Sequence, residues 1–360
     1  MFVVPYLHMA HCLSVGYLPK CRVMKERHVR RDVHGHLPFY NASTAERHLF
    51  FLSDSEYLVH KWIVGHPLLA MYGPRWDHNS GFRGRANRQT TSPPGHIIIP
   101  QFNSLPDFQP SVVIERQQEE QERNLSLAFV SEFMNRRMAG GPARSPRFRR
   151  KYLLDSLSQT PNISGLPLIA NNSPTKFNKE SAHEGGLYGL YRRSILCPIL
   201  AGDISWQRRF FDVMACGCLP VVMHYKLTLP FVNQTNEAVQ LEKDWTNKYS
   251  WYVPEQHIEI GNTWSVRESF PFVDEIDYKS FTVQVEGNYS VHTDMSHVTP
   301  ALEAFLSDTE GLKRKQEALR ETVVKFLYGV GPDAHRYDDA FAHLIRSLRF
   351  YLNHLNKSAE

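Results

Sequence analysis

The segment from Ser194 to Val222 constrains the fold of this chain more than any other. Two short apolar runs flank a stretch with helical spacing, in the order Ile195–Pro198, Arg208–Cys216 and Leu219–Val222. Gly217 stands where that helix should end, a position that favours glycine. The segment therefore predicts a strand, a turn, a helix and a second strand. This alternation is typical of an α/β fold with a parallel sheet and crossover connections.

The turn before the predicted helix has the features of a phosphate site. Gly202 lies in the turn, and the side chain of Asp203 or Ser205 can cap the helix. Arg208 and Arg209 fall in the first helical turn, where cations oppose the helix dipole. An anion held between the arginines and the free amide groups would reverse that cost. The pattern alone fits solvated surface arginines equally well.

The rest of the chain alternates in the same way. Short apolar runs predict strands at Phe2–Tyr6, Ile97–Ile99, Leu125–Val130 and Phe281–Val285. Apolar spacing predicts a helix within Ala45–Val64, a helix with Leu312, Leu319, Val323 and Phe326 on one face, and a last helix with Phe341, Leu344, Ile345, Leu348 and Leu352 on one face. The charge run Arg116–Arg123 is typical of a solvated face or linker.

Composition limits the function classes. A length of 360 residues allows two domains, and a net charge of +4 is too small to indicate nucleic acid. No apolar run reaches the roughly 18 to 20 residues of a membrane span. Met1–Tyr6 lacks the features of a signal peptide and reads as a core strand. Because domains rarely begin on such a strand, we expect a segment upstream of Met1.

Cysteines and sequons bear on the compartment. The chain has five cysteines, so at least one thiol stays free if the others pair. Cys216 and Cys218 are expected to be small buried core residues rather than metal ligands. Asn-x-Ser/Thr sequons, more frequent than chance predicts and pointing to a secretory lumen, occur at Asn41, Asn124, Asn162, Asn171, Asn233, Asn288 and Asn356.

Three ordered blocks resemble the exostosin family of inverting glycosyltransferases, with spacing closest to its plant-like members. The first block comprises Tyr188, Ser194, Cys197, Pro198, Gly202-Asp203, Arg208, Phe211-Asp212 and Gly217-Cys218-Leu219-Pro220-Val221. The second comprises Pro271-Phe272, Asp277-Tyr278 and Phe281-Thr282-Val283-Gln284-Val285-Glu286. The third comprises Tyr328 and Asp339-Ala340-Phe341. Arg123-Asn124-Leu125 into Phe129 resembles the strand that opens the family's donor domain, and Phe2–Tyr6 and Ile97–Pro100 resemble pieces of its first half.

The resemblance implies an α/β fold with two Rossmann-like domains facing a cleft, of the GT-B type. Residues 1–112 would form a shortened or divergent acceptor-side domain, and residues 113–360 a nucleotide-sugar donor domain with closing helices. The implied reaction transfers a hexosyl or pentosyl group, with inversion, from a UDP-linked sugar to a glycan or glycoprotein. No cofactor is expected, and the implied setting is polysaccharide biosynthesis in the Golgi lumen, with no membrane anchor in this chain.

The same resemblance assigns residues. Donor binding would fall to Gly202, Asp203, Ser205, Arg208, Arg209 and Glu286, with Arg208 neutralising the diphosphate and Glu286 accepting bonds from the ribose hydroxyls. Asp77 and His78 are the nearest candidates for the base that deprotonates the acceptor. The chain lacks an Asp-x-Asp motif, so we expect no metal in the reaction.

Two alternatives stay open. Trp206 stands where the family usually has Ser or Thr, and the first half matches in pieces only, which would suit a non-catalytic binding or partner subunit of a glycosyltransferase complex. A metal-dependent hydrolase using His28, His34 and His36 is disfavoured, because these histidines lack a ligand pattern of the HExxH kind and fit a surface loop.

Overall fold

A computed structural model of the chain describes its ordered elements and their immediate surroundings. The described residues are 2–4, 37, 39, 41, 43–44, 47–52, 68–71, 96–100, 106–119, 123–131, 153–160, 162–171, 173, 177, 184–199, 208–225, 271–272, 275–287 and 296–358. They form two compact units. Unit 1 comprises Met1–Pro100, Pro254–Asp274 and His343–Glu360, and unit 2 comprises Gln101–Val253 and Glu275–Ala342.

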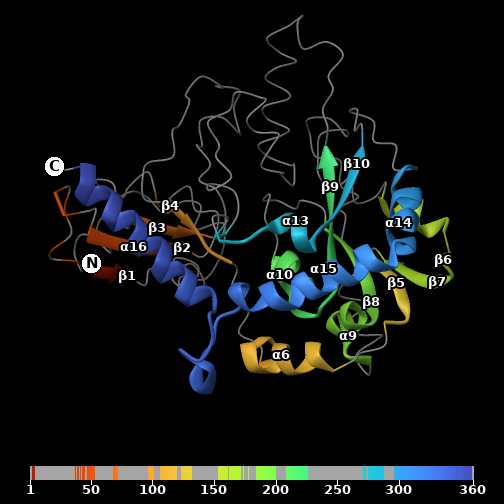
Figure 1. The fold of residues 1–360 in the computed structure, drawn as a ribbon, viewed down its shortest axis with the longest axis horizontal. Coiled ribbons are helices and arrows are strands. Elements are labelled where there is room, and N and C mark those ends of the chain that lie inside the picture. Colours follow the sequence, from red (N-terminus) through yellow and green to blue (C-terminus); the bar gives the residue numbers. More distant parts are fainter. Residues whose placement is uncertain are drawn as a thin grey trace, which may run out of the picture. The chain divides into compact units, whose positions relative to one another are not determined.

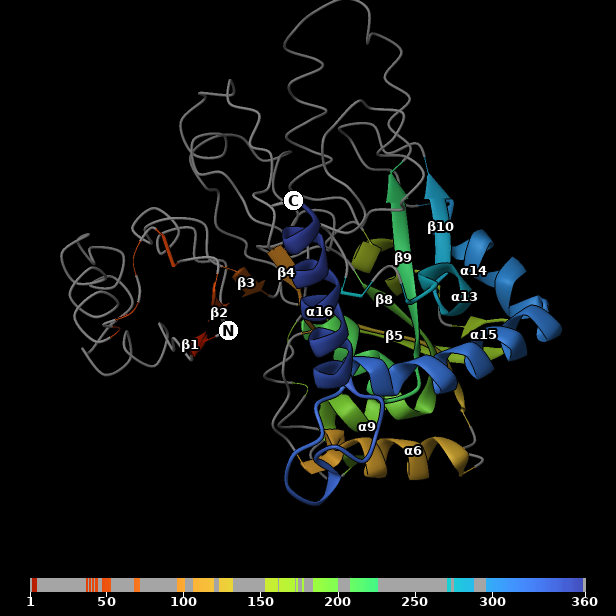
Figure 2. The ribbon, with the colours of Figure 1, turned by 60° about the vertical axis from the view of Figure 1, so that its left-hand side comes forward.

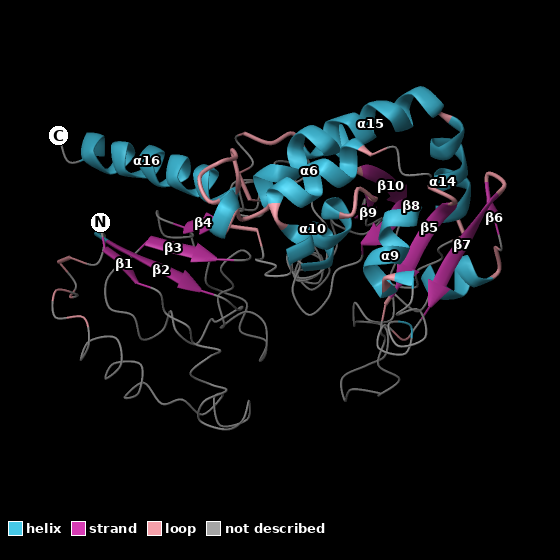
Figure 3. Cartoon of the chain, turned by 90° about the horizontal axis from the view of Figure 1, so that it is seen from below, coloured by secondary structure: helices cyan, strands magenta, loops and turns pink. Residues whose placement is uncertain are grey.

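Unit 1 contains a parallel sheet. Its strands are β1 (Phe2–Val4), β2 (His48–Leu52), β3 (Leu68–Met71) and β4 (His96–Ile98), and they neighbour one another in chain order. Figure 3 shows the arrows of β1, β2 and β3 running in the same direction. This arrangement confirms the strands expected at residues 2–6 and 97–99. The first is observed over Phe2–Val4, and the second begins and ends one residue earlier than expected.

The start of the helix expected within Ala45–Val64 is wrong. Residues His48–Leu52 form β2, which pairs with β1 on one side and β3 on the other. Leu49 and Phe50 are both fully buried. Adjacent residues on a strand point to opposite faces, so both faces of this strand are covered, as in parallel sheets generally. The rest of the expected helix lies outside the described residues.

Unit 2 is built on a larger sheet in the order β10-β9-β8-β5-β7-β6. Its strands are β5 (Leu125–Val130), β6 (Asn162–Ile163), β7 (Leu166–Asn171), β8 (Ser194–Ile199), β9 (Leu219–Tyr225) and β10 (Val283–Gly287). All neighbours are parallel except β6 and β7, which form an antiparallel hairpin. Figures 1 and 2 both show the arrowheads of β9 and β10 at one edge of the sheet and α6 towards the opposite edge.

Helices and 3-10 turns make up the other described elements of the two units. They are α6 (Pro110–Gln118), α9 (Gly186–Arg193), α10 (Arg208–Ala215), α13 (Tyr278–Phe281), α14 (Val298–Ser307), α15 (Thr309–Thr322) and α16 (Ala340–Ser358), with 3-10 turns η3 (Pro106–Phe108), η7 (Val323–Phe326) and η8 (Gly331–Asp333). The order from α9 through β8 and α10 to β9 confirms the element order expected for Ser194–Val222. The mixed α/β class with parallel sheets is likewise confirmed.

An aromatic cluster fixes α10 in the core of unit 2. Every residue of α10 from Phe210 onwards is buried. The Phe210 ring stacks on Tyr278 of α13 at 6.3 Å between centroids, and Phe211 lies 5.7 Å from Phe326 of η7. Arg208 and Arg209 come directly before this buried stretch, in the first turn of α10. The later residues of the helix therefore hold it in the core, and the packed stretch begins only after the two arginines.

The last helix buries a different face from the one its apolar spacing suggests. Leu344 and Leu348 are buried as expected, but Phe341 is 44% exposed and Ile345 is 42% exposed. The buried face includes His343, whose ring packs 5.2 Å from that of Phe272. Asp339 precedes the helix and accepts hydrogen bonds from the backbone N–H of Ala342 and of Gly329. Its carboxylate is thus committed to capping α16.

Candidate functional site

The sheet of unit 2 has a topological switch point between β5 and β8. From β5 the chain moves to β7 on one side, and then returns across β5 to build β8, β9 and β10 on the other side. Connections on opposite sides of such a point leave a crevice at the carboxyl ends of the two strands. Ligands of open α/β sheets bind there, so the carboxyl edge beside β5 and β8 is the candidate site.

The first turn of α10 faces this edge. β8 ends at Ile199 and its parallel neighbour β9 begins at Leu219, so the chain must return to the opposite edge between them. α10 makes that return, which puts its first residue, Arg208, on the carboxyl side. Arg209 follows and is half-buried. The helix thus begins at the carboxyl edge of the sheet, with its free amide groups and two arginines in its first turn.

Glu286 lies at the same edge. It is the fourth residue of the five-residue strand β10 and is paired in register with His224 of β9. Because β8, β9 and β10 are adjacent and parallel, their carboxyl ends share one edge. The fold therefore brings Glu286 and Arg208, which are far apart in sequence, to one side of the sheet. These are the positions of the backbone of Arg208 and Glu286.

Other expected site residues are outside the part of the chain that the structure describes. Gly202, Asp203 and Ser205 belong to the connection before α10, and Asp77 and His78 belong to the first half of the chain. Their roles stay predictions. Among the described residues there is no group of three His, Cys, Asp or Glu side chains that could hold a metal ion. Nor is any helix in those residues long and apolar enough to span a membrane.

Sequence reasoning missed one polar residue at the switch point. Ser131 follows β5 directly, and its backbone N–H donates to the carbonyl of Asn171, the last residue of β7, at 2.9 Å. Ser131 is 1% exposed, and its Oγ has no hydrogen-bond partner among the described residues. A buried hydroxyl without a partner is costly and is favoured where a ligand supplies one. Its place directly after the predicted strand Leu125–Val130 is the signal that could have found it.

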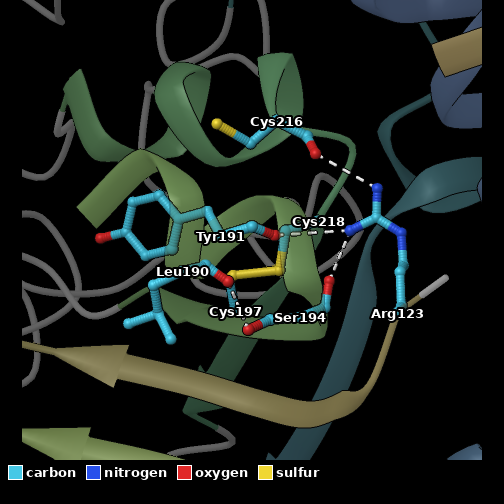
Figure 4. Close-up of a disulfide and its surroundings, with 7 residues drawn as sticks. All are labelled: Arg123, Leu190, Tyr191, Ser194, Cys197, Cys216 and Cys218. Carbon is cyan, nitrogen blue, oxygen red and sulfur yellow. Dashed lines mark hydrogen bonds between the residues drawn. A yellow bond between two sulfur atoms is a disulfide. The ribbon is translucent and has the colours of Figure 1, made fainter. Parts of the chain in front are cut away.

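The opposite edge of the sheet is closed by Arg123. Its guanidinium donates to the carbonyl oxygens of Ser194 at 2.6 Å, Cys216 at 3.2 Å and Tyr191 at 3.4 Å (Figure 4). These carbonyls lie at the carboxyl-terminal ends of α9 and α10, where helices leave acceptors unsatisfied and where a cation is favoured. Arg123 thus joins the two helices that flank β8.

Burial lowers the pKa of Arg123 to about 10, so the guanidinium stays protonated at neutral pH. The interpretation of Arg116–Arg123 as a solvated face or linker is therefore wrong at its end. At its start, residues 116–118 belong to α6, and Gln117 Nε2 donates to the carbonyl of Met214 in α10 at 3.1 Å. Charge runs are usually exposed to solvent. Here, however, the long side chains of Gln117 and Arg123 donate hydrogen bonds to carbonyl groups near the carboxyl-terminal ends of α9 and α10.

A disulfide lies beside Arg123. Cys197 of β8 and Cys218, the residue before β9, are bonded, with their Cα atoms 5.9 Å apart (Figure 4). Both are buried, as expected for Cys218, but spacing alone did not pair them. Cys216 remains a buried free thiol whose pKa is raised to about 12, mainly by burial. The bond joins the two strands on either side of α10 and fixes where that helix must fit.

The fold and this edge define an α/β protein with a helix N-terminus at the carboxyl edge of a mostly parallel sheet, a class that includes many nucleotide-dependent enzymes. The chain belongs to the exostosin GT47 family, because the model of the Exostosin GT47 domain matches residues 2–268. The match includes the block from Ser194 to Val222 and ends before Pro271. It makes the protein a member of a glycosyltransferase family.

Two other comparisons add little. No curated protein matches the chain. Among solved structures, the crystal structure of WaaG, a glycosyltransferase involved in lipopolysaccharide biosynthesis, is similar with 12% identity and a TM-score of 0.34, over 76% of this chain and 70% of that one. A likeness of this size carries no functional inference.

Proposed function

We propose that the protein is an inverting glycosyltransferase that transfers a hexosyl or pentosyl group from a UDP-linked sugar to a hydroxyl of a glycan or glycoprotein. One observation carries the proposal. Within a member of the exostosin GT47 family, the fold puts Arg208, Glu286 and Ser131 at the carboxyl edge of the larger sheet. A cation can bind the phosphates of a nucleoside diphosphate, a carboxylate can accept hydrogen bonds from its ribose hydroxyls, and a hydroxyl can donate to a phosphate oxygen.

The first turn of α10 supplies the charge for the leaving group. As the bond between the sugar and the diphosphate breaks, negative charge grows on the phosphate oxygens. The Arg208 guanidinium can bind two of these oxygens at once, and the free amides of α10 add their dipoles. Such preorganised charge stabilises the transition state more than any other single factor. Arg209 adds a second cation on the same turn.

Glu286 and Ser131 would hold the rest of the donor. A carboxylate accepts two hydrogen bonds, so Glu286 suits the two ribose hydroxyls. The Ser131 hydroxyl, whose Oγ lacks a partner among the described residues, would donate to a phosphate oxygen or a sugar hydroxyl. Gly202, Asp203 and Ser205 would line the turn beside the phosphates. Asp77 or His78 would take the proton from the acceptor as the new glycosidic bond forms.

We place this reaction in the Golgi lumen. The sequon excess and a buried disulfide both suit an oxidising secretory compartment, where disulfides persist. The partners proposed are the UDP-sugar and the glycan or glycoprotein acceptor, with a second glycosyltransferase subunit as a further partner.

Replacing Arg208 tests the donor site. We expect Arg208→Ala to weaken UDP binding by about 1.5 to 3 kcal/mol, or roughly 10- to 150-fold, because a charge-assisted contact to phosphate is lost. Isothermal titration calorimetry with UDP measures the change. Arg193→Ala is the matched control, because Arg193 ends α9 at the opposite edge and pairs with exposed Glu184. Equal UDP affinity in all three proteins would remove Arg208 from the site.

A further inference from the structure

The β6–β7 hairpin carries two sequons in opposite settings. One is Asn162-Ile163-Ser164 at its first strand, and the other is Asn171-Asn172-Ser173 at the end of its second strand. Both have the same chemistry, an asparagine amide with a hydroxyl two residues later. The pair therefore allows a comparison in which only the surroundings differ.

Asn162 faces solvent. It is exposed while its neighbour Ile163 is fully buried, as the alternation of a strand requires. The hairpin turn follows at once, with Ser164 at φ 53° and Gly165 at φ 78°. Positive φ at both central residues is typical of the tight type I′ hairpin turn. The hydroxyl of the sequon thus lies in an exposed turn beside the asparagine.

Asn162 also lies far from the candidate donor site. It pairs with Pro167, near the start of β7, and β6 is the outermost strand of the sheet. Pro167 lies four residue steps before Asn171 at the carboxyl edge, or about 13 Å along the strand. A bulky group on Asn162 would project from the end of the sheet opposite the switch point.

Asn171 is in the opposite position. It is half-buried, its Oδ1 accepts the Ser173 N–H at 2.8 Å, and its carbonyl accepts the Ser131 N–H. A glycan on its Nδ2 would have to leave at the carboxyl edge of the sheet, beside Ser131. Such a group would compete both with these contacts and with a donor.

We infer that Asn162 carries an N-linked oligosaccharide in the folded protein and that Asn171 does not. The co-reactant is an oligosaccharide joined to a lipid diphosphate. The Asn162 Nδ2–C1 bond forms, the C1–oxygen bond to the diphosphate breaks, the amide loses one proton and the lipid diphosphate leaves. The inference rests on the proposed lumenal location. The glycan also covers the exposed edge of the sheet, where a bare strand invites association with other chains.

Site-by-site mapping of the secreted full chain tests the inference. The chain is expressed behind a signal peptide in a glycosylating host, and the glycans are released with an amidase that turns each occupied asparagine into aspartate. Peptide mass spectrometry should find aspartate at 162 and asparagine at 171. Asn162→Gln and Ser164→Gly should each remove one glycan from the intact mass, and Asn171→Gln should remove none.

The Ser164→Gly variant controls for loss of the glycan through misfolding. Ser164→Gly deletes the hydroxyl of the sequon, while glycine suits the positive φ of residue 164 better than serine does. An unmodified Asn162 in the secreted wild type, or an occupied Asn171, overturns the inference. UDP titration of the same preparation tests the proposed function separately, since a protein that fails to bind UDP still reports its occupancy at residue 162.

Discussion

At the scale of single residues, the arginine just before β5 shows how a half-buried charge can be stabilised by backbone dipoles. The guanidinium of Arg123 donates to three carbonyls at the ends of α9 and α10. The residue marks the family resemblance, yet it lies at the edge opposite Ser131. We therefore assign Arg123 a role in holding α9 and α10 together, and none in binding the donor.

Gly217 lets Arg123 reach these carbonyls. It has φ 73°, and a Cβ added there would collide with Arg123 Nη2. Gly165 has nearly the same φ, 78°, but a Cβ there would meet nothing within 4 Å. Gly165→Ala should therefore cost only the left-handed backbone, about 1 to 2 kcal/mol of unfolding free energy. Gly217→Ala should cost at least about 1 kcal/mol more, because the Arg123 contacts must also shift.

Urea denaturation of the two variants measures this difference. Since the backbone penalty is shared, subtracting one value from the other leaves the cost of disturbing Arg123. Equal losses in the two variants would show that Arg123 contributes nothing through Gly217.

At the scale of elements, the disulfide joins the strands on either side of α10. Cys197 and Cys218 are 21 residues apart, and closing a loop of about that length stabilises a protein by roughly 3 kcal/mol. We expect reductant to lower the unfolding free energy of the wild type by about this amount. The double variant Cys197→Ala/Cys218→Ala should be insensitive to reductant. Chemical denaturation with and without reductant makes the comparison.

Cys216→Ala provides the control for this element. Its thiol is free and buried, so the variant should lose some packing energy and keep the full response to reductant. A loss of the response in Cys216→Ala would mean that Cys216 takes part in the disulfide.

At the scale of the whole molecule, charge neutralisation by arginine and helix amides predicts how turnover depends on metal. These groups face the carboxyl edge of the unit 2 sheet, and a divalent ion on the same phosphate oxygens would duplicate their charge. We therefore expect transfer or hydrolysis of a UDP-sugar to continue in excess chelator. Release of UDP, followed with and without chelator, measures this.

Two results would change the picture. Strict dependence on manganese would show that the phosphates are held by a metal rather than by α10. UDP binding without any turnover would instead favour the non-catalytic partner subunit that Trp206 and the divergent first half suggest.

The local elements of unit 2 could be predicted from short stretches of sequence. The strand Leu125–Val130, the helix from Arg208 and the glycine turn at Gly217 follow from apolar runs and turn chemistry over a few residues. Such signals are short-range, so they are read without knowing the neighbours. The candidate residues Arg208 and Glu286 could be found in this way, together with the resemblance.

What those elements pack against depends on the folded arrangement of distant segments. His48–Leu52 is a strand because it pairs with β1 on one edge and with β3 on the other, and Cys197 is bonded to Cys218 because β8 and β9 are neighbours. Likewise, the sheet order puts Ser131 at the switch point and Arg123 at the opposite edge. The strand at β2, the disulfide pairing and the positions of Ser131 and Arg123 all depend on contacts between segments far apart in the sequence. The local spacing of apolar residues does not indicate which strands will be neighbours in the sheet.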